Sequence, residues 1–231
     1  MMSGWLVVLG QDTEGMVKYT NEFKFRDGIF LNFEQARRNA PISKAKLLSS
    51  IDYNDREFFK KLFENDKVYF YNDMGERQEI AKKDIWGYSR NGILYIQVQG
   101  NFNRITFMGS ICHFVADITT EDRYYSPYGY GGYGYNPYMS SYYNPYYSSY
   151  YSPYYSPYSR RSTRTELRQF IIDWETGKVM DFDVDNVTRL LIKDPELHEE
   201  FARLSRRKKK DMLFVYIRKF DEKYPLYLPA Q

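Results

Sequence analysis

Hydrophobic and polar positions alternate over much of the chain with the two-residue period of a β-strand. In one apolar run Leu94, Ile96 and Val98 alternate with Tyr95, Gln97 and Gln99. This run follows Asn91-Gly92, the dipeptide typical of a two-residue hairpin turn. We predict strands at residues 85–89, 94–99, 102–107 and 111–118, which form one antiparallel sheet with a buried face.

Two more hairpins are predicted on either side of this meander. The first joins residues 68–71 to residues 78–81 through the turn Asn72–Gly75. The second joins residues 166–174 to residues 178–182 through Glu175-Thr176-Gly177. We expect the second hairpin to extend the same sheet.

Helical spacing alternates with these strands. Asn32, with Gln35 three residues later, predicts a capped helix that Pro41 ends. Asn54 and Glu57 repeat that spacing before a second apolar stripe over residues 58–63.

The C-terminal part is predicted to be helical, in three segments. Val187 belongs to a short stripe, Asp194-Pro195 starts the next helix, and a strongly amphipathic helix ends at Tyr224-Pro225. Five basic residues, Arg206–Lys210, precede this last helix. They fit a solvated helix start, although cations there oppose the helix dipole, or a contact with an anionic partner such as a lipid headgroup.

These elements predict an α+β fold. We expect an antiparallel sheet of about six to eight short strands, peripheral helices, C-terminal helices packed on the sheet, and a long Tyr-rich flexible insert. Residues 11–123 and 159–231 would form a single domain, residues 124–158 the insert, and residues 1–10 the remnant of a signal peptide.

Composition changes this picture in one window. The chain has 231 residues, 33 basic and 30 acidic, so its net charge of +3 excludes a dominant polyanion-binding surface. Sixteen of its 25 tyrosines lie between Tyr124 and Tyr158, a stretch that carries no charge. Proline and the lack of aliphatic residues predict a flexible, partly polyproline-like loop there.

The second half of this insert is an imperfect repeat of Tyr-Tyr-(Ser/Asn)-Pro. Each tyrosine offers an apolar ring and a hydroxyl, which suits protein or envelope surfaces. A low-complexity insertion that has drifted in a tolerant surface loop is the alternative. The candidate partner-binding residues are Tyr142, Tyr143, Tyr146, Tyr147, Tyr150, Tyr151, Tyr154 and Tyr155.

Candidate catalytic chemistry is sparse. Cys112 is the only cysteine, which excludes an intramolecular disulfide and favours a buried small hydrophobe. His113 and His198 are the only histidines, and Asp181, Asp183 and Asp185 lack the rest of a calcium loop. The chain also lacks a phosphate-binding loop and a Gly-x-Ser-x-Gly elbow. We therefore predict no catalytic residues, no cofactor, no metal and no enzyme activity.

The N-terminal residues bear on location. Trp5–Leu9 followed by Gly10 resembles the end of a signal-peptide core, and an ordinary N-terminal strand is the alternative. No apolar run approaches 18 residues, so we predict no transmembrane helix. We expect a periplasmic or envelope-associated protein, or a cytoplasmic one if residues 1–10 are not a signal remnant.

Three stretches carry a family resemblance. Residues 27–34, with Asn39-Ala40-Pro41, resemble the "DGIYLSFEEF...N.P" opening of uncharacterised envelope proteins from Bacteroidetes. Residues 85–96 are similar to their central Trp-Gly-Tyr hairpin, and residues 170–178 to their later strand turn. The resemblance spans residues 23–118 and 166–228. It implies an exported, periplasmic protein and supplies no functional residue.

Two classes of function follow. The first is a non-enzymatic exported protein whose Tyr-rich loop mediates protein or surface interactions. The second is an intracellular single-strand nucleic-acid-binding protein that stacks tyrosines beside Arg160, Arg161 and Arg164, and an unidentified enzyme is a further alternative. The Tyr-rich window has no basic residue, which disfavours nucleic acid. No sequence feature assigns an oligomeric state.

Overall fold

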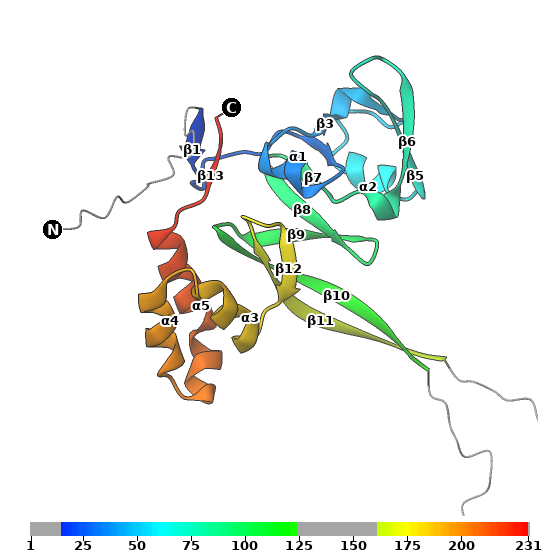
Figure 1. Cartoon of the computed structure of the whole chain (residues 1–231). Helices are drawn as coiled ribbons and strands as arrows, with labels where there is room; N and C mark the ends of the chain where they lie inside the picture. The colour runs from blue at the N-terminus through cyan, green and yellow to red at the C-terminus, as the bar shows by residue number, and fades with distance from the viewer. Residues whose placement is uncertain (1–14, 124–160, 231) are drawn as a thin grey trace, which may run out of the picture. The chain divides into compact units, whose positions relative to one another are not determined.

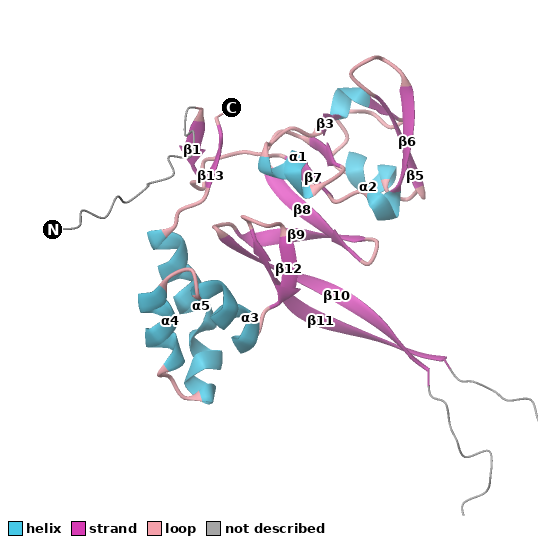
Figure 2. Cartoon of the chain, in the orientation of Figure 1, coloured by secondary structure: helices cyan, strands magenta, loops and turns pink. Residues whose placement is uncertain are grey.

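The computed structural model describes residues 15–123 and 161–230 and shows an α+β chain (Figures 1 and 2). The chain divides into two compact units, Met1–Ile118 with Leu167–Gln231, and Thr119–Glu166. The prediction of one domain over 11–123 and 159–231 stays a prediction. In the described part of the chain, no helix combines the length and the apolar character needed to cross a membrane.

An eight-stranded sheet contains the predicted meander. Its spatial order is β12-β11-β10-β9-β8-β7-β2-β3. The hairpin at 166–182 does extend the same sheet, as predicted. The strands are β2 (Gly28–Phe30), β3 (Ile42–Ser43), β7 (Gly87–Arg90), β8 (Ile93–Val98), β9 (Asn101–Phe107), β10 (Ile111–Arg123), β11 (Arg161–Asp173) and β12 (Lys178–Asp181).

Turn chemistry explains the meander locally. Asn91 and Gly92 have φ angles of 53° and 76°, so both central residues of the turn between β7 and β8 are left-handed, as a type I′ hairpin requires. In β8, Leu94 and Ile96 are buried, as the alternation predicted. The predicted Asn-Gly hairpin turn is therefore confirmed.

Two smaller sheets complete the strands. One has the order β4-β5-β6 and the other pairs β1 with β13. The predicted hairpin at 68–81 is confirmed. The strands are β1 (Met16–Lys18), β4 (Leu47–Leu48), β5 (Lys67–Tyr71), β6 (Arg77–Ala81) and β13 (Tyr227–Pro229).

Most helices begin at a side chain that accepts a backbone hydrogen bond. Asn32, Asp183, Asp194 and Ser205 each accept from the backbone three residues later. The predicted cap at Asn54 is wrong, because that helix starts only at Phe58 and Glu57 precedes it without a side-chain cap bond. The helices are α1 (Phe33–Arg37), α2 (Phe58–Leu62), α3 (Val184–Leu191), α4 (Pro195–Ala202) and α5 (Arg206–Lys223).

The sheet is buried on both faces near β10 and β11. Ile111 and Ile171 pack with the apolar residues of α3, α4 and α5, whereas Cys112 and Ile172 belong to a second core. Successive strand residues point to opposite faces, so each strand supplies both cores. The C-terminal helices therefore pack on the sheet, as predicted.

Candidate functional site

The predicted partner-binding tyrosines, Tyr142 to Tyr155, lie outside the described residues. The structure does describe the two strands on either side of the insert. Near its ends, Thr119 Oγ1 lies 3.1 Å from Thr165 Oγ1, and Thr120 Oγ1 donates to the Arg164 carbonyl at 3.3 Å. The partner's residue number falls from 165 to 164 as the number on the other strand rises from 119 to 120, as in an antiparallel pair. The chain on either side of the insert is joined by this pairing.

A cleft of about 340 Å³ lies where the end of β11, the start of β10 and the end of α5 meet. We call it the junction cleft. Its inner wall includes Asp173, Trp174, Leu190 and Phe220, all buried. Three partly exposed apolar side chains, Met16, Tyr224 and Tyr227, also line it. No sequence pattern predicts this cleft, because its residues come from distant segments.

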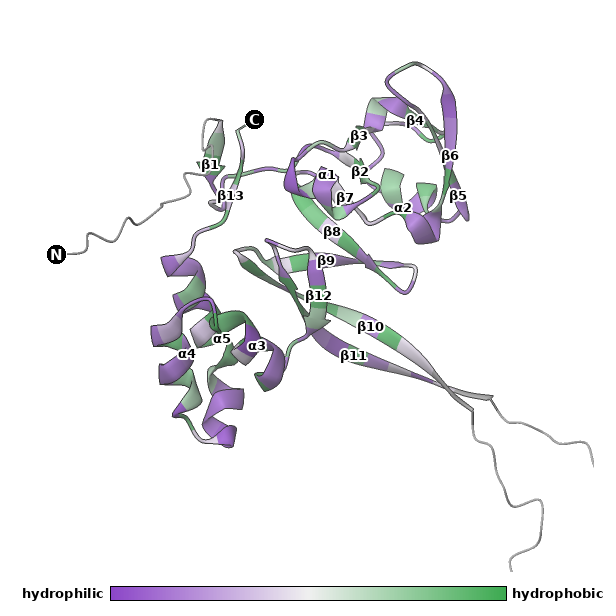
Figure 3. Ribbon diagram, viewed as in Figure 1, coloured by the Kyte–Doolittle hydropathy of each residue, from purple (hydrophilic) through white to green (hydrophobic). Residues whose placement is uncertain are grey.

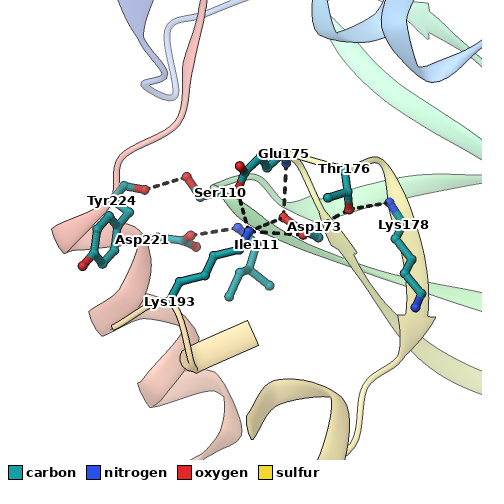
Figure 4. A network of polar contacts seen from close by, with 9 residues as sticks. All are labelled: Ser110, Ile111, Asp173, Glu175, Thr176, Lys178, Lys193, Asp221 and Tyr224. Atoms are coloured by element: carbon teal, nitrogen blue, oxygen red, sulfur yellow. Dashed lines mark hydrogen bonds and ion pairs between the residues drawn. The ribbon is translucent and has the colours of Figure 1, made fainter. Parts of the chain in front are cut away.

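Lys193 carries the positive charge nearest the buried acid of this cleft. Its Nζ lies 2.6 Å from Glu175 Oε2 and 3.3 Å from both carboxylate oxygens of Asp173 (Figure 4). Burial lowers the pKa of Lys193, but the hydrogen bond to Glu175 and the charge of Asp173 outweigh it, so the pKa is raised overall. Lys193 therefore stays protonated and ties the end of α3 to the β11–β12 turn.

The Asp173 carboxylate accepts hydrogen bonds from the β11–β12 turn. It is 7% exposed, and it accepts from the Glu175 backbone at 3.2 Å and from Thr176 Oγ1 at 3.0 Å. The following Gly177 has φ 73°, and a Cβ there would lie 2.4 Å from the Phe33 ring. The sequence predicted this turn, but it did not reveal that Asp173 holds it.

Asp221, near the end of α5, is the most perturbed acid of the region. Its Oδ1 accepts from the Ile111 backbone N–H at 2.9 Å, next to the Ser110 hydroxyl, which donates to the Tyr224 carbonyl at 2.6 Å (Figure 4). Its Oδ2 is buried without a hydrogen-bond partner among the described residues. Burial raises the pKa of Asp221 to about 7, against the two backbone hydrogen bonds from Ile111 and Ser110.

Gly109 makes room for this carboxylate. A Cβ at Gly109 would lie 2.2 Å from Asp221 Oδ2 and 2.5 Å from its Cγ. The acid thus packs directly on the glycine, in the turn before β10. This close packing and the buried Oδ2 explain why the charged form of Asp221 is disfavoured.

Trp174 is a second buried polar group without a partner. Its side chain is 3% exposed and its Nε1–H has no acceptor among the described residues. The ring packs against Phe33 with a centroid distance of 5.2 Å, and its backbone N–H donates to the Ser110 carbonyl at 2.9 Å. Trp174 therefore joins the cleft to the aromatic core.

The residues that the sequence singled out for chemistry are built into the core. Cys112 is fully buried, its Sγ lies 3.2 Å from the Gly109 carbonyl, and burial raises the pKa of its thiol far above the usual range. This confirms the interpretation of a small buried hydrophobe. His113 contacts Thr106 Oγ1 at 3.1 Å and Gln169 Oε1 at 3.0 Å, and burial lowers its pKa. His113 is therefore neutral at pH 7.

Asp181, Asp183 and Asp185 also have local roles, and Asp185 lies in the first turn of α3. Asp183 caps α3 by accepting from the Asn186 backbone at 2.8 Å, and Asp181 pairs with Arg168 at 3.3 Å. Within residues 15–123 and 161–230, no three His, Cys, Asp or Glu side chains gather in a way that could hold a metal ion.

Comparison with known proteins adds no assignment. No protein-family model, no curated protein and no solved structure matched this chain.

Proposed function

We propose that the folded part of this chain is a non-enzymatic scaffold that presents the Tyr-rich segment to a protein or envelope surface. The observation that carries this proposal is the pairing of β10 with β11. These are the longest strands of the described chain, 13 residues each, and the insert lies between them in sequence. Neighbouring strands lie about 4.8 Å apart, so the pairing holds the two ends of the insert together.

Such an attachment suits a long insertion. Loop-closure entropy grows only with the logarithm of loop length, so a long segment costs little more than a short one once its ends are held. Many tyrosines on one chain then bind through weak contacts that gain from their effective concentration. Fixed geometry is not needed for that mode of binding.

The charged groups around the junction cleft support a non-catalytic scaffold. Lys193, Asp173 and Glu175 are engaged with one another and with the turn, and Asp221 is packed on Gly109. Their contacts stabilise the junction of β10, β11 and α5. Export to the periplasm or envelope remains part of the proposal through the resemblance of residues 23–118 and 166–228 to Bacteroidetes envelope proteins.

The test uses full-length chain and isolated envelope membranes. Changing Tyr to Ser in pairs, at 142 with 143, then 146 with 147, then 154 with 155, should weaken binding in proportion to the number changed. A Ser140→Ala, Ser141→Ala variant is the matched control, because it lies in the same insert and keeps every ring. Salt should have little effect on this binding, because the insert has no charge to screen.

Two outcomes would contradict the proposal. If all three pairs together left binding unchanged, the insert would not be the binding element. If full-length chain bound a single-stranded oligonucleotide more tightly than envelope membranes, the nucleic-acid alternative would replace it.

A further inference from the structure

The cations in the second half of α5 form ion pairs, whereas those in its first turns do not pair with any described residue. In the second half, Lys219 lies 2.8 Å from Glu200, and Lys223 lies 3.0 Å from Asp194 and 2.7 Å from Glu196. All three acids belong to α4 or its cap. These cations therefore serve the packing of α4 against α5.

The first turns of α5 have no such partners. Arg206, Arg207, Lys208 and Lys210 are exposed and form no ion pair with any of the described residues. Of these five basic residues, Lys209 packs against α4, with its Nζ 5.6 Å from the centre of the Phe201 ring. Figure 3 shows the strongly hydrophilic colour of this end of the helix.

This arrangement is unfavourable for the helix taken alone. Cations near a helix N-terminus oppose its dipole, and like charges four residues apart, such as Arg206 and Lys210, repel each other. The Ser205 cap accepts only one backbone N–H, that of Lys208, at 3.4 Å. An external anion would relieve both repulsions.

Exposed apolar side chains follow on the same side of α5. Phe214 and Val215 are each 39% exposed. Arg207, Lys210 and Phe214 are spaced i, i+3 and i+7, so they lie along one face of the helix. The Phe214 ring is held by Phe182 at 4.5 Å and His113 at 4.7 Å between ring centres, which fixes its position.

We propose that this face of α5 binds the surface of an anionic lipid bilayer. We call it the basic face: Lys210, Phe214, Arg207 and Val215 lie on the exposed side of the helix with the acid Asp211 among them, and Arg206 and Lys208 flank them in the first turn. The four cations match the negative headgroups, and the ring and the valine lie where the helix can meet the boundary of the acyl chains. Exposed aliphatic surface beside the cations favours a bilayer over a nucleic acid, which offers such a side chain no apolar layer.

The expected strength follows from the number of free cations. Each Lys or Arg near an anionic membrane raises partitioning roughly fivefold. Four such residues would account for a large preference for anionic over neutral vesicles. Because the attraction is between exposed charges, it should fall steeply between about 50 mM and about 500 mM salt.

The experiment is co-sedimentation of the full chain with vesicles. One set contains phosphatidylcholine alone, and the other contains about 30% phosphatidylglycerol, an anionic lipid that gives the vesicles a negative surface potential. The wild-type chain should sediment with the anionic vesicles and not with the neutral ones. The R206Q/R207Q/K208Q/K210Q variant should lose at least roughly 50-fold in partitioning. Gln has nearly the same helix propensity as Lys and Arg, so the unfolding temperature of this variant should not fall.

A matched control removes the same charge elsewhere. Lys18, Lys83, Arg104 and Lys178 are exposed and form no ion pair with the described residues. Changing these four to Gln should reduce partitioning far less than the change on α5. Val215→Gln, with all cations kept, should reduce partitioning several-fold, which separates apolar contact from charge.

Three results would overturn the proposal. These are equal sedimentation of wild-type chain with both vesicles, equal partitioning of the α5 variant and its control, or tighter binding of a single-stranded oligonucleotide than of anionic vesicles. The proposal does not depend on the Tyr-rich insert. A chain with residues 124–158 replaced by a Gly/Ser linker should bind anionic vesicles unchanged even if it no longer binds envelope membranes.

Discussion

Two aspartates beside the same helix face opposite electrostatic environments. Asp194 caps α4 and lies 3.0 Å from Lys223, and its side chain is 3% exposed. Asp221 lies two residues before Lys223 but faces the Ser110–Ile111 backbone and Gly109, and it forms no ion pair with any residue in the described part of the chain. The backbone N–H of Leu197 and then Lys223 lower the pKa of Asp194, whereas burial raises that of Asp221 to about 7.

The difference shows that burial alone does not decide whether the charged form of a carboxylate is disfavoured in the folded chain. Asp194 is buried where a helix N-terminus and an ammonium stabilise its charge. Among the described residues, only two backbone hydrogen bonds stabilise the charge of Asp221, so its neutral and charged forms are both populated near pH 7. The two acids should therefore give the folded chain opposite pH dependences.

Filling the space beside Asp221 should have the largest effect. In Gly109→Ala the new Cβ would lie 2.2 Å from Oδ2, so the end of α5 or the turn before β10 must move. We expect a loss of about 3 kcal/mol in the free energy of unfolding, measured by urea denaturation. Combining it with Asp221→Ala should cost less than the sum of the two single changes, because the clash disappears. Additive costs would show that the two residues are not in close contact.

Removing the charge of Asp221 should change the pH dependence of stability. Its pKa is about 7 folded and 3.8 unfolded, so between these values the folded state holds the extra proton. Stability due to this group therefore falls as pH rises from 3.8 to about 7 and is constant above. Asp221→Asn keeps the acceptor for Ile111 and should flatten this slope, so the stability of the variant relative to the wild-type chain should rise by about 4 kcal/mol between pH 4 and pH 8.

The matched control for this change is Asp117→Asn. Asp117 is an exposed acid of β10. Its replacement should leave the slope between pH 4 and pH 8 as it is in the wild-type chain. A wild-type slope retained in Asp221→Asn would show that another group is responsible for it.

Removing the cap at Asp194 should lower stability at neutral pH. Asp194→Ala removes the acceptor for the Leu197 N–H and the partner of Lys223. We expect the unfolding temperature to fall by about 5 °C at pH 7. The contribution of a lowered pKa is present above the unfolded value and is lost as pH falls, so the difference from wild type should shrink below about pH 4. A constant difference down to pH 2 would contradict the assigned charge interaction.

Sequence patterns predicted local features of this comparison and missed the distant ones. Asp194-Pro195 is a contiguous signal, and the helix starts there as expected. Asp221 meets Ile111 across 110 residues, and Met16 pairs with Pro229. No periodic pattern encodes which chain segments meet. The three-residue strands β1 and β13 are also too short for an alternation to be recognised.

The same contrast explains the outcome for the candidate chemistry. The burial of Cys112 followed from the apolar run around it. The junction cleft could not be predicted in this way, since Lys193, Asp173 and Asp221 each belong to a segment with an ordinary amphipathic or turn pattern. A perturbed acid such as Asp221 becomes visible only when its surroundings are known. Gly109, before β10, makes room for the Asp221 carboxylate, and no local sequence pattern predicts that contact.

The smallest effect should come from Lys223→Gln, which leaves the cap of Asp194 in place and removes only the cation. The cap bond from the Leu197 N–H remains and Lys223 is itself partly exposed, so the unfolding temperature at pH 7 should fall less than in Asp194→Ala. The pKa of Asp194 should move toward its usual value, because the Leu197 N–H then acts without Lys223. As the pH falls, the loss of stability due to Asp194 should therefore be smaller than in the wild-type chain and should be complete at a higher pH. Carboxyl resonances followed by NMR during an acid titration would measure this shift directly.

An unchanged pKa of Asp194 would mean that the helix N-terminus alone stabilises its charge. The difference in pKa between Asp194 and Asp221 would then come from their backbone surroundings and not from the missing cation.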